Sequence, residues 1–283
     1  MKAEDKPVES AGLLWDSGIA EQVSIPGKGM AYSIHEKMAD GSWQTREDST
    51  ILDVRNDSRI VSPLKHPLWP LPGRPLDYGS DMELFDEKRE YFQHYLELKD
   101  KRAFDLASAW VDVTWRTEEF SSLPYLFFIA PPGRAKSRFL ELLAEVSYRG
   151  WLITHPTVAS VFWAVDRYSP TLLADNYEHW PRETRHELDG LFNAGYRRGA
   201  IVPRRPREGE SGGELQVYRV YSPKAIAGIR VPPDSLASRC AFIHMAKNRR
   251  GSPLEIDRDW AQKIRSKQLA YRFRHFESWG DKA

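Results

Sequence analysis

One short stretch of the sequence combines the residue types that bind phosphate groups. It reads Ala130-Pro131-Pro132-Gly133-Arg134-Ala135-Lys136-Ser137, between an apolar run and an amphipathic segment. In such a loop, backbone amides bind phosphate oxygens, the lysine neutralises terminal phosphates, and the hydroxyl can bind magnesium. Alanine replaces glycine at two positions of the G-x-x-x-x-G-K-[ST] pattern, 130 and 135, so an ordinary turn with a surface lysine is the alternative. The residues predicted to bind the phosphates are Gly133, Arg134, Ala135, Lys136, Ser137 and Arg138.

A second apolar run ends in an acidic residue. Thr171-Leu172-Leu173-Ala174 is followed by Asp175 and Asn176. If this run is a strand beside the loop, Asp175 and Ser137 would together hold magnesium. The position after such an aspartate usually carries a glutamate that activates water, whereas the amide of Asn176 can orient water but cannot take its proton. Glu178 is a possible substitute acid, and an aspartate that only caps the next segment is the alternative interpretation of Asp175.

The elements that must position these residues follow from the spacing of apolar side chains. The continuous apolar run 123–129 is typical of a buried parallel strand. Strands alternate with helices from there on, which predicts an α/β fold with a parallel sheet flanked by helices. We expect helices over 82–98, 104–115, 137–147, 158–168, 182–195 and 256–276, and strands over 123–129, 151–154, 171–174, 200–202, 215–221 and 241–246.

The first eighty residues have a different pattern of apolar residues. Residues 1–25 show no sustained period and are expected to form a loose arm, whereas 30–61 contain short strand-like runs separated by turn pairs. Five prolines between 62 and 80 exclude a helix or a central strand and predict an extended linker. The predicted division is therefore 1–80 as a β-containing segment with a proline-rich linker, 81–250 as the α/β core, and 251–283 as a basic helix.

Two basic segments are candidates for contact with nucleic acid. The strands at 200–202 and 215–221 predict a β-hairpin insert whose tip carries Arg204, Arg205 and Arg207. Such cations can follow a phosphate backbone without reading its sequence. Glutamates in the same tip favour the alternative of a solvated surface hairpin. The terminal helix, which mixes basic and aromatic residues, could bind nucleic acid or contact a neighbouring subunit.

Composition excludes several other classes of protein. The 283 residues include 41 Lys and Arg against 40 Asp and Glu, so nucleic acid would have to bind through a local patch rather than net charge. The single cysteine, Cys240, excludes a disulfide framework and a multi-cysteine metal site. No apolar stretch approaches the ~20 residues that span a bilayer, and the polar start of the chain is unlike a signal peptide. We expect a cytoplasmic protein without a membrane role.

Four blocks together resemble a known class of protein: PPGRAKSRFLELL, SPTLLADN, LFNAGYRRGAIVPR and YSPKAIAG…LASRC. Over residues 85–250 the chain resembles the AAA+ class of P-loop ATPases, particularly the helicase-like ATPases of phage, plasmid and archaeal mobile elements, with degenerate Walker A and Walker B motifs. The resemblance implies ATP and Mg²⁺ as cofactors, and a ring or open-ring homo-oligomer with nucleotide at its interfaces.

The resemblance also implies two further site residues. Such proteins carry a polar residue at the end of a strand that contacts the γ-phosphate, and Ser222 matches it after Val217–Tyr221. Arg239, in Ser238-Arg239-Cys240, matches the arginine that reaches a neighbouring subunit's nucleotide. With Asn176, these are the residues implied for catalysis.

Two functions from different classes are consistent with these features. The first is a DNA helicase or translocase whose ATP hydrolysis is slowed or lost through Ala135 and Asn176. The second is a nucleotide-gated or catalytically degenerate assembly subunit that recruits other proteins to DNA. A structural component that no longer binds nucleotide is a third possibility.

Overall fold

The computed structural model describes residues 7–53, 59–204, 215–246 and 251–279. The chain forms two compact units, one from Met1–Lys88 together with Asp257–Ala283, and the other from Arg89–Ile256. The terminal helix α7 (Arg258–Trp279) therefore belongs to the same unit as the N-terminal strands. The sequence instead predicts boundaries at residues 80 and 250 and a separate basic helix over 251–283.

Two small sheets form most of the first unit. The strands β2 (Gly12–Trp15), β3 (Gly18–Ile25), β4 (Gly29–Lys37) and β5 (Trp43–Asp48) make an antiparallel sheet in that order. In the second sheet β7 (Arg59–Pro63) lies between β1 (Val8–Ser10), which is parallel to it, and the antiparallel β6 (Ile51–Asp53). Tyr32 and Ile34 of β4 are central to the core of this unit.

The expectation of a loose arm over residues 1–25 is wrong for the part that the structure describes, because β1, β2 and β3 lie there. Strand β3 is buried on both faces although it contains Glu21 and Gln22. The side chain of Gln22 donates to the Leu64 carbonyl at 2.8 Å and accepts from the Leu64 amide at 3.2 Å. Buried polar side chains that are hydrogen-bonded in this way interrupt the apolar pattern of the strand. Hydrophobic periodicity therefore does not detect it.

The proline-rich segment has neither helix nor strand after Pro63, as predicted, but it packs along α7 within the first unit. The Gly73 amide donates to Ser266 Oγ at 2.9 Å, and Arg265 Nε donates to the Leu71 carbonyl at 3.1 Å. Arg272 on the same helix forms a buried ion pair with Glu21 at 2.9 Å, with both side chains 6% exposed. Several basic residues of α7 are therefore internal and do not form a free cationic surface.

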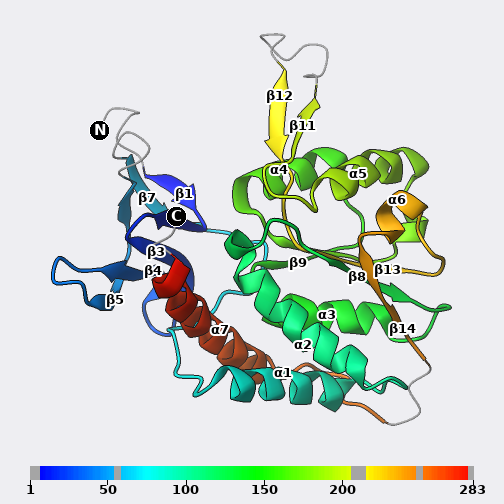
Figure 1. The fold of residues 1–283 in the computed structure, drawn as a ribbon, viewed down its shortest axis with the longest axis horizontal. Helices are drawn as coiled ribbons and strands as arrows, with labels where there is room; N and C mark the ends of the chain where they lie inside the picture. Colours follow the sequence, from blue (N-terminus) through cyan, green and yellow to red (C-terminus); the bar gives the residue numbers. More distant parts are fainter. Residues whose placement is uncertain (1–6, 54–58, 205–214, 247–250, 280–283) are drawn as a thin grey trace. The chain divides into compact units, whose positions relative to one another are not determined.

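The second unit is built on a five-stranded sheet that is parallel throughout (Figure 1). This confirms the predicted α/β class with a parallel sheet flanked by helices. The strand order is β14-β8-β13-β10-β9. The strands are β8 (Tyr125–Ile129), β9 (Gly150–Ile153), β10 (Thr171–Ala174), β13 (Lys224–Gly228) and β14 (Cys240–His244).

Helices cover both faces of this sheet. In Figure 1, α2 (Arg102–Trp115) and α3 (Lys136–Val146) lie on one face, and α4 (Val158–Tyr168) and α5 (Arg182–Ala194) lie on the other. The remaining helical segments are α1 (Asp81–Tyr95), which crosses from the first unit into the second, α6 (Asp234–Ala237), and the 3₁₀ turns η2 (Thr117–Glu119) and η3 (Tyr177–His179). No helix in the described parts of the chain is long and apolar enough to cross a membrane.

The central strand β13 was not predicted. It has the sequence Lys-Ala-Ile-Ala-Gly, in which alanine, glycine and lysine all have low strand propensity. The two strands expected just before it, at 200–202 and 215–221, do exist as an antiparallel pair, β11 (Ile201–Arg204) and β12 (Gln216–Arg219). The connection between them, residues 205–214, lies outside the described residues.

Candidate functional site

The loop between β8 and α3 has an open, uncapped helix N-terminus. Gly133 has φ +70°, and the space that a side chain would occupy there is open. Ala135 immediately precedes α3 in the left-handed conformation, at φ +58°, and no side chain caps the helix. The first amides of a helix have no intrahelical partners, so they are available to an anion.

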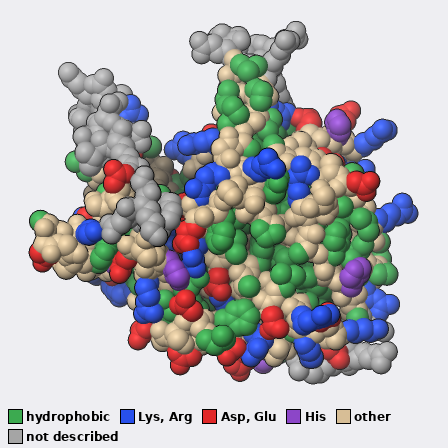
Figure 2. Space-filling model, viewed as in Figure 1, with side chains coloured by type: hydrophobic (Ala, Val, Ile, Leu, Met, Phe, Trp, Pro, Cys, Tyr) green, Lys and Arg blue, Asp and Glu red, His purple; other side chains and the backbone are tan. Residues whose placement is uncertain are grey.

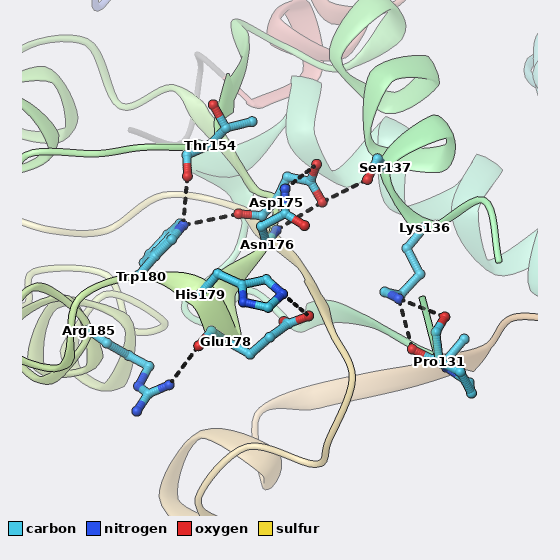
Figure 3. Close-up of polar contacts among 11 residues, drawn as sticks. Pro131, Lys136, Ser137, Thr154, Asp175, Asn176, Glu178, His179, Trp180 and Arg185 are labelled. Atoms are coloured by element: carbon cyan, nitrogen blue, oxygen red, sulfur yellow. Dashed lines mark hydrogen bonds and ion pairs between the residues drawn. The ribbon is translucent and has the colours of Figure 1, made fainter. Parts of the chain in front are cut away.

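Two cations belong to this loop. Lys136 donates from Nζ to the carbonyl oxygens of Ala130 at 2.8 Å and Pro131 at 3.1 Å, so its side chain lies back along its own loop (Figure 3). Arg134 makes no hydrogen bond or ion pair with any residue that the structure describes. The ammonium group of Lys136 is therefore bound only by neutral carbonyl oxygens, and the guanidinium group of Arg134 has no partner among the described residues.

A hydrogen bond joins the loop to the acid that ends β10. Ser137 Oγ donates to Asp175 Oδ1 at 3.0 Å, and the amide of Asn176 donates to the same oxygen at 2.9 Å. In the sheet, β13 separates the loop strand β8 from β10, so this contact crosses an intervening strand. The sequence prediction that these two oxygen ligands lie together agrees with this geometry.

The turn after Asp175 is fixed by Trp180. Its indole Nε1 donates to the carbonyls of Thr154 and Asp175, each at 3.0 Å, and so holds the ends of β9 and β10 together (Figure 3). Asn176 has φ +53°, which asparagine tolerates better than most residues. Its side-chain amide lies 3.4 Å from Asp175 Oδ2.

One carboxylate oxygen of Glu178 has no hydrogen-bond partner among the described residues. Its side chain is 22% exposed, and Oε1 lies 3.9 Å from His179 Nε2. Its other oxygen, Oε2, is buried and has no hydrogen-bond partner among the described residues. Figure 3 shows the carboxylate pointing away from Arg185, which binds the Glu178 backbone carbonyl, and toward the side where Pro131 and Lys136 lie. A buried acceptor without a partner is expected to bind water or a ligand.

The assignment of Ser222 to the γ-phosphate is corrected by the topology. Ser222 precedes β13, and its Oγ accepts from Lys224 Nζ at 3.1 Å. Because β13 is parallel to β8, with Gly228 opposite Ile129, the start of β13 lies at the other edge of the sheet from the loop. The strand expected to end at 221 is instead β12, which ends at Arg219 and belongs to the antiparallel pair.

Arg230 follows the end of β13 that does lie beside the loop. The Ala130 amide donates to the Gly228 carbonyl at 3.4 Å, which places the end of β13 next to the start of the loop. Arg230 is exposed and has no polar partner among the residues described. Sequence reasoning missed it because it missed β13.

Arg239 also lies at the edge of the sheet opposite the loop. It directly precedes β14, which runs parallel to β8. Its guanidinium lies 5.0 Å from the ring of Tyr196 and donates to the Ser235 carbonyl. Arg239 is therefore not part of the loop site of its own chain.

The other predicted cations are already engaged. Arg138 donates to the Pro253 carbonyl at 3.1 Å and forms an ion pair with Glu141 at 3.3 Å. Arg204 forms an ion pair with Glu187, and its guanidinium lies 4.5 Å from the Phe162 ring. Arg205 and Arg207 lie outside the described residues.

The oxygens of Ser137 and Asp175 suit a magnesium ion whose other ligands are phosphate oxygens and water. In the described ranges, no three His, Cys, Asp or Glu side chains are grouped to hold a metal. Mg²⁺ in such sites takes one or two protein oxygens and completes its shell with phosphate and water. The Ser137 hydroxyl and the Asp175 carboxylate supply two oxygens of this kind.

No protein-family model and no curated protein matches this sequence.

Proposed function

We propose that the chain binds ATP with Mg²⁺ at the loop between β8 and α3. The observation that carries this proposal is the 3.0 Å hydrogen bond between Ser137 and Asp175, which joins two candidate magnesium ligands across β13. The uncapped start of α3, and Arg134, whose guanidinium has no partner among the described residues, support an anion site at the same loop. The AAA+ resemblance stated above supports the same assignment.

Each residue has a definite role in this proposal. Lys136 exchanges the carbonyls of Ala130 and Pro131 for phosphate oxygens, since an anion is a better partner for an ammonium. Ser137 and Asp175 hold the magnesium, which screens phosphate charge when bound. Asn176 orients a water, and the carboxylate of Glu178, whose Oε2 has no partner among the described residues, takes its proton. Arg239 acts on the nucleotide of a neighbouring copy in a ring.

We further propose that the protein acts on DNA, as a helicase or translocase with slow hydrolysis. The alternative, an assembly subunit that recruits partner proteins to DNA, is favoured by one observation. The side chain of Asn176 is turned to Asp175, and an amide cannot serve as a base. Binding of ATP alone is sufficient for assembly, whereas a motor needs turnover.

The test is equilibrium binding of labelled ATP with magnesium, with the mass followed by light scattering. Lys136→Ala is expected to weaken binding strongly, while Lys99→Ala, an exposed lysine in the same unit, is expected to leave it unchanged. An increase in mass with ATP supports the ring. If Lys136→Ala binds ATP as tightly as the natural sequence does, the loop is not the nucleotide site.

A further inference from the structure

The outer face of α4 carries an exposed tryptophan. Ala159, Ser160, Trp163 and Arg167 are all exposed and follow helical spacing, with Trp163 51% exposed. The indole packs nearly perpendicular to the ring of Tyr168, with the two ring centroids 5.3 Å apart. It remains half exposed beside this partner. An indole that stays half exposed can still offer a ring face on which a nucleic-acid base stacks.

Arginines frame this tryptophan. The Arg167 guanidinium lies 5.8 Å from the Trp163 ring. Arg219 of β12, 77% exposed, pairs with Asp166 at 3.1 Å, and its amide donates to the same carboxylate at 2.9 Å. These bonds fix the β11–β12 pair to α4, and they neutralise the one carboxylate that lies near the tryptophan on this helix. Figure 2 shows Lys and Arg side chains gathered at the base of the projecting strand pair.

We propose that α4 binds single-stranded nucleic acid by stacking a base on Trp163, with the neighbouring phosphates on Arg167 and Arg219. Charge complementarity selects the partner, since the aromatic ring lies beside two arginines, Arg167 and Arg219, and the single carboxylate of α4, Asp166, is paired with Arg219. A single strand is required because base faces are covered in a duplex. Stacking needs only a π-face, so the contact is tolerant of sequence. This inference rests on the proposed nucleic-acid role and is independent of ATP binding.

The experiment measures fluorescence anisotropy of labelled oligo-dT with the full chain. Trp163→Ala is expected to weaken binding by roughly ten-fold, and Trp163→Phe by less, because phenylalanine keeps a stacking face. Leu106→Ala, an exposed apolar residue on α2, is the matched control and is expected to change nothing. An abasic strand of equal length, which offers phosphates without bases, is expected to bind the natural protein and Trp163→Ala equally.

Equal affinity of Trp163→Ala and the natural protein for oligo-dT would overturn the inference. If charge-reversing variants at Arg205 and Arg207 abolish binding while Trp163→Ala does not, the nucleic-acid role stands and the stacking contact fails. If no oligonucleotide binds at all, both fail. If Trp163→Ala changes the mass by light scattering without changing DNA binding, the surface is a contact between copies, and the inference is overturned.

Discussion

Ala135 is the residue at which the loop departs most consequentially from its pattern. A left-handed conformation costs a residue with a Cβ about 1–2 kcal/mol, and Ala135 adopts it at φ +58°. The chain maintains this geometry although glycine would adopt it without strain. Strain retained in this way is common where a ligand binds.

We therefore expect Ala135→Gly to stabilise the protein. Relief of strain at least matches the roughly 0.5–1 kcal/mol that glycine costs through the unfolded state, which leaves a gain of up to about 1.5 kcal/mol. Ala130→Gly is the matched control, because Ala130 is not among the described residues with positive φ, and it should only destabilise. Urea denaturation measures both. Equal losses from the two substitutions would contradict the assignment of strain.

Glu178 leads to a second prediction at this scale. If it is the base, Glu178→Gln should lower ATP hydrolysis by about two orders of magnitude, the usual contribution of a general base, and leave ATP binding intact. Glu183→Gln, at an exposed position on α5, is the control. Single-turnover hydrolysis and equilibrium binding separate the two effects. Loss of binding together with hydrolysis would mean that Glu178 only supports the fold of the turn.

Lys136, Ser137 and Asp175 could be predicted because their types and spacing are local properties of the sequence. Ser222 could not be placed correctly, because its position depends on which strand occupies the centre of the sheet. The sequence offers Glu178 only as a possible acid and misses Arg230, because no pattern along the chain shows that a carboxylate oxygen lacks a partner among the described residues or that a residue lies beside the loop in space.

At the scale of elements, the strands and helices with a strong apolar period were predictable within a few residues, as β8, α3 and β10 show. The errors fell on β3 and β13, where buried strands contain charged or small residues. The buried ammonium of Lys224 in β13 is bound by backbone carbonyls, with Ser222 O nearest at 2.8 Å. Burial lowers the pKa of Lys224 well below its ordinary value.

The contact between the N-terminal sheet and α7 predicts a pH dependence. The His35 ring is stacked between Trp43 and Phe273, at 5.0 Å from each, and lies 3.0 Å from Glu277. Burial holds the pKa of His35 below its ordinary value of 6.5, and Glu277 partly opposes that shift. The unfolded chain therefore takes up the proton at higher pH than the folded chain.

The free energy of unfolding of this unit should accordingly be constant above pH 6.5 and fall as the pH drops below 6.5. His35→Phe keeps an aromatic ring in the stack and cannot titrate, so its stability should depend less on pH in that range. Denaturant melts of both proteins on either side of this pH provide the measurement. An identical slope for the two would assign the effect to other groups.

At the scale of the whole molecule, the chain has two compact units. A ligand stabilises only the part of a protein that it binds, by ~2.7 kcal/mol at a concentration of 100 times its dissociation constant. The proposed nucleotide site lies wholly in Arg89–Ile256. In calorimetry, ATP with magnesium should therefore raise the unfolding temperature of that unit and leave the unfolding temperature of the other unit unchanged. Lys136→Ala should abolish the shift. A uniform shift of both transitions would mean that the two units unfold together.

The discontinuous first unit has a consequence for the order in which the protein is made. All five parallel strands leave the ribosome before α7 does, so the second unit can complete its core while synthesis continues. The N-terminal strands leave first but have no helix to cover them, and Glu21 has no Arg272 to pair with until the last turns of α7 are made. The N-terminal strands are thus synthesised well before α7 but are among the last parts of the chain to reach their final structure, because their unit is completed only by α7.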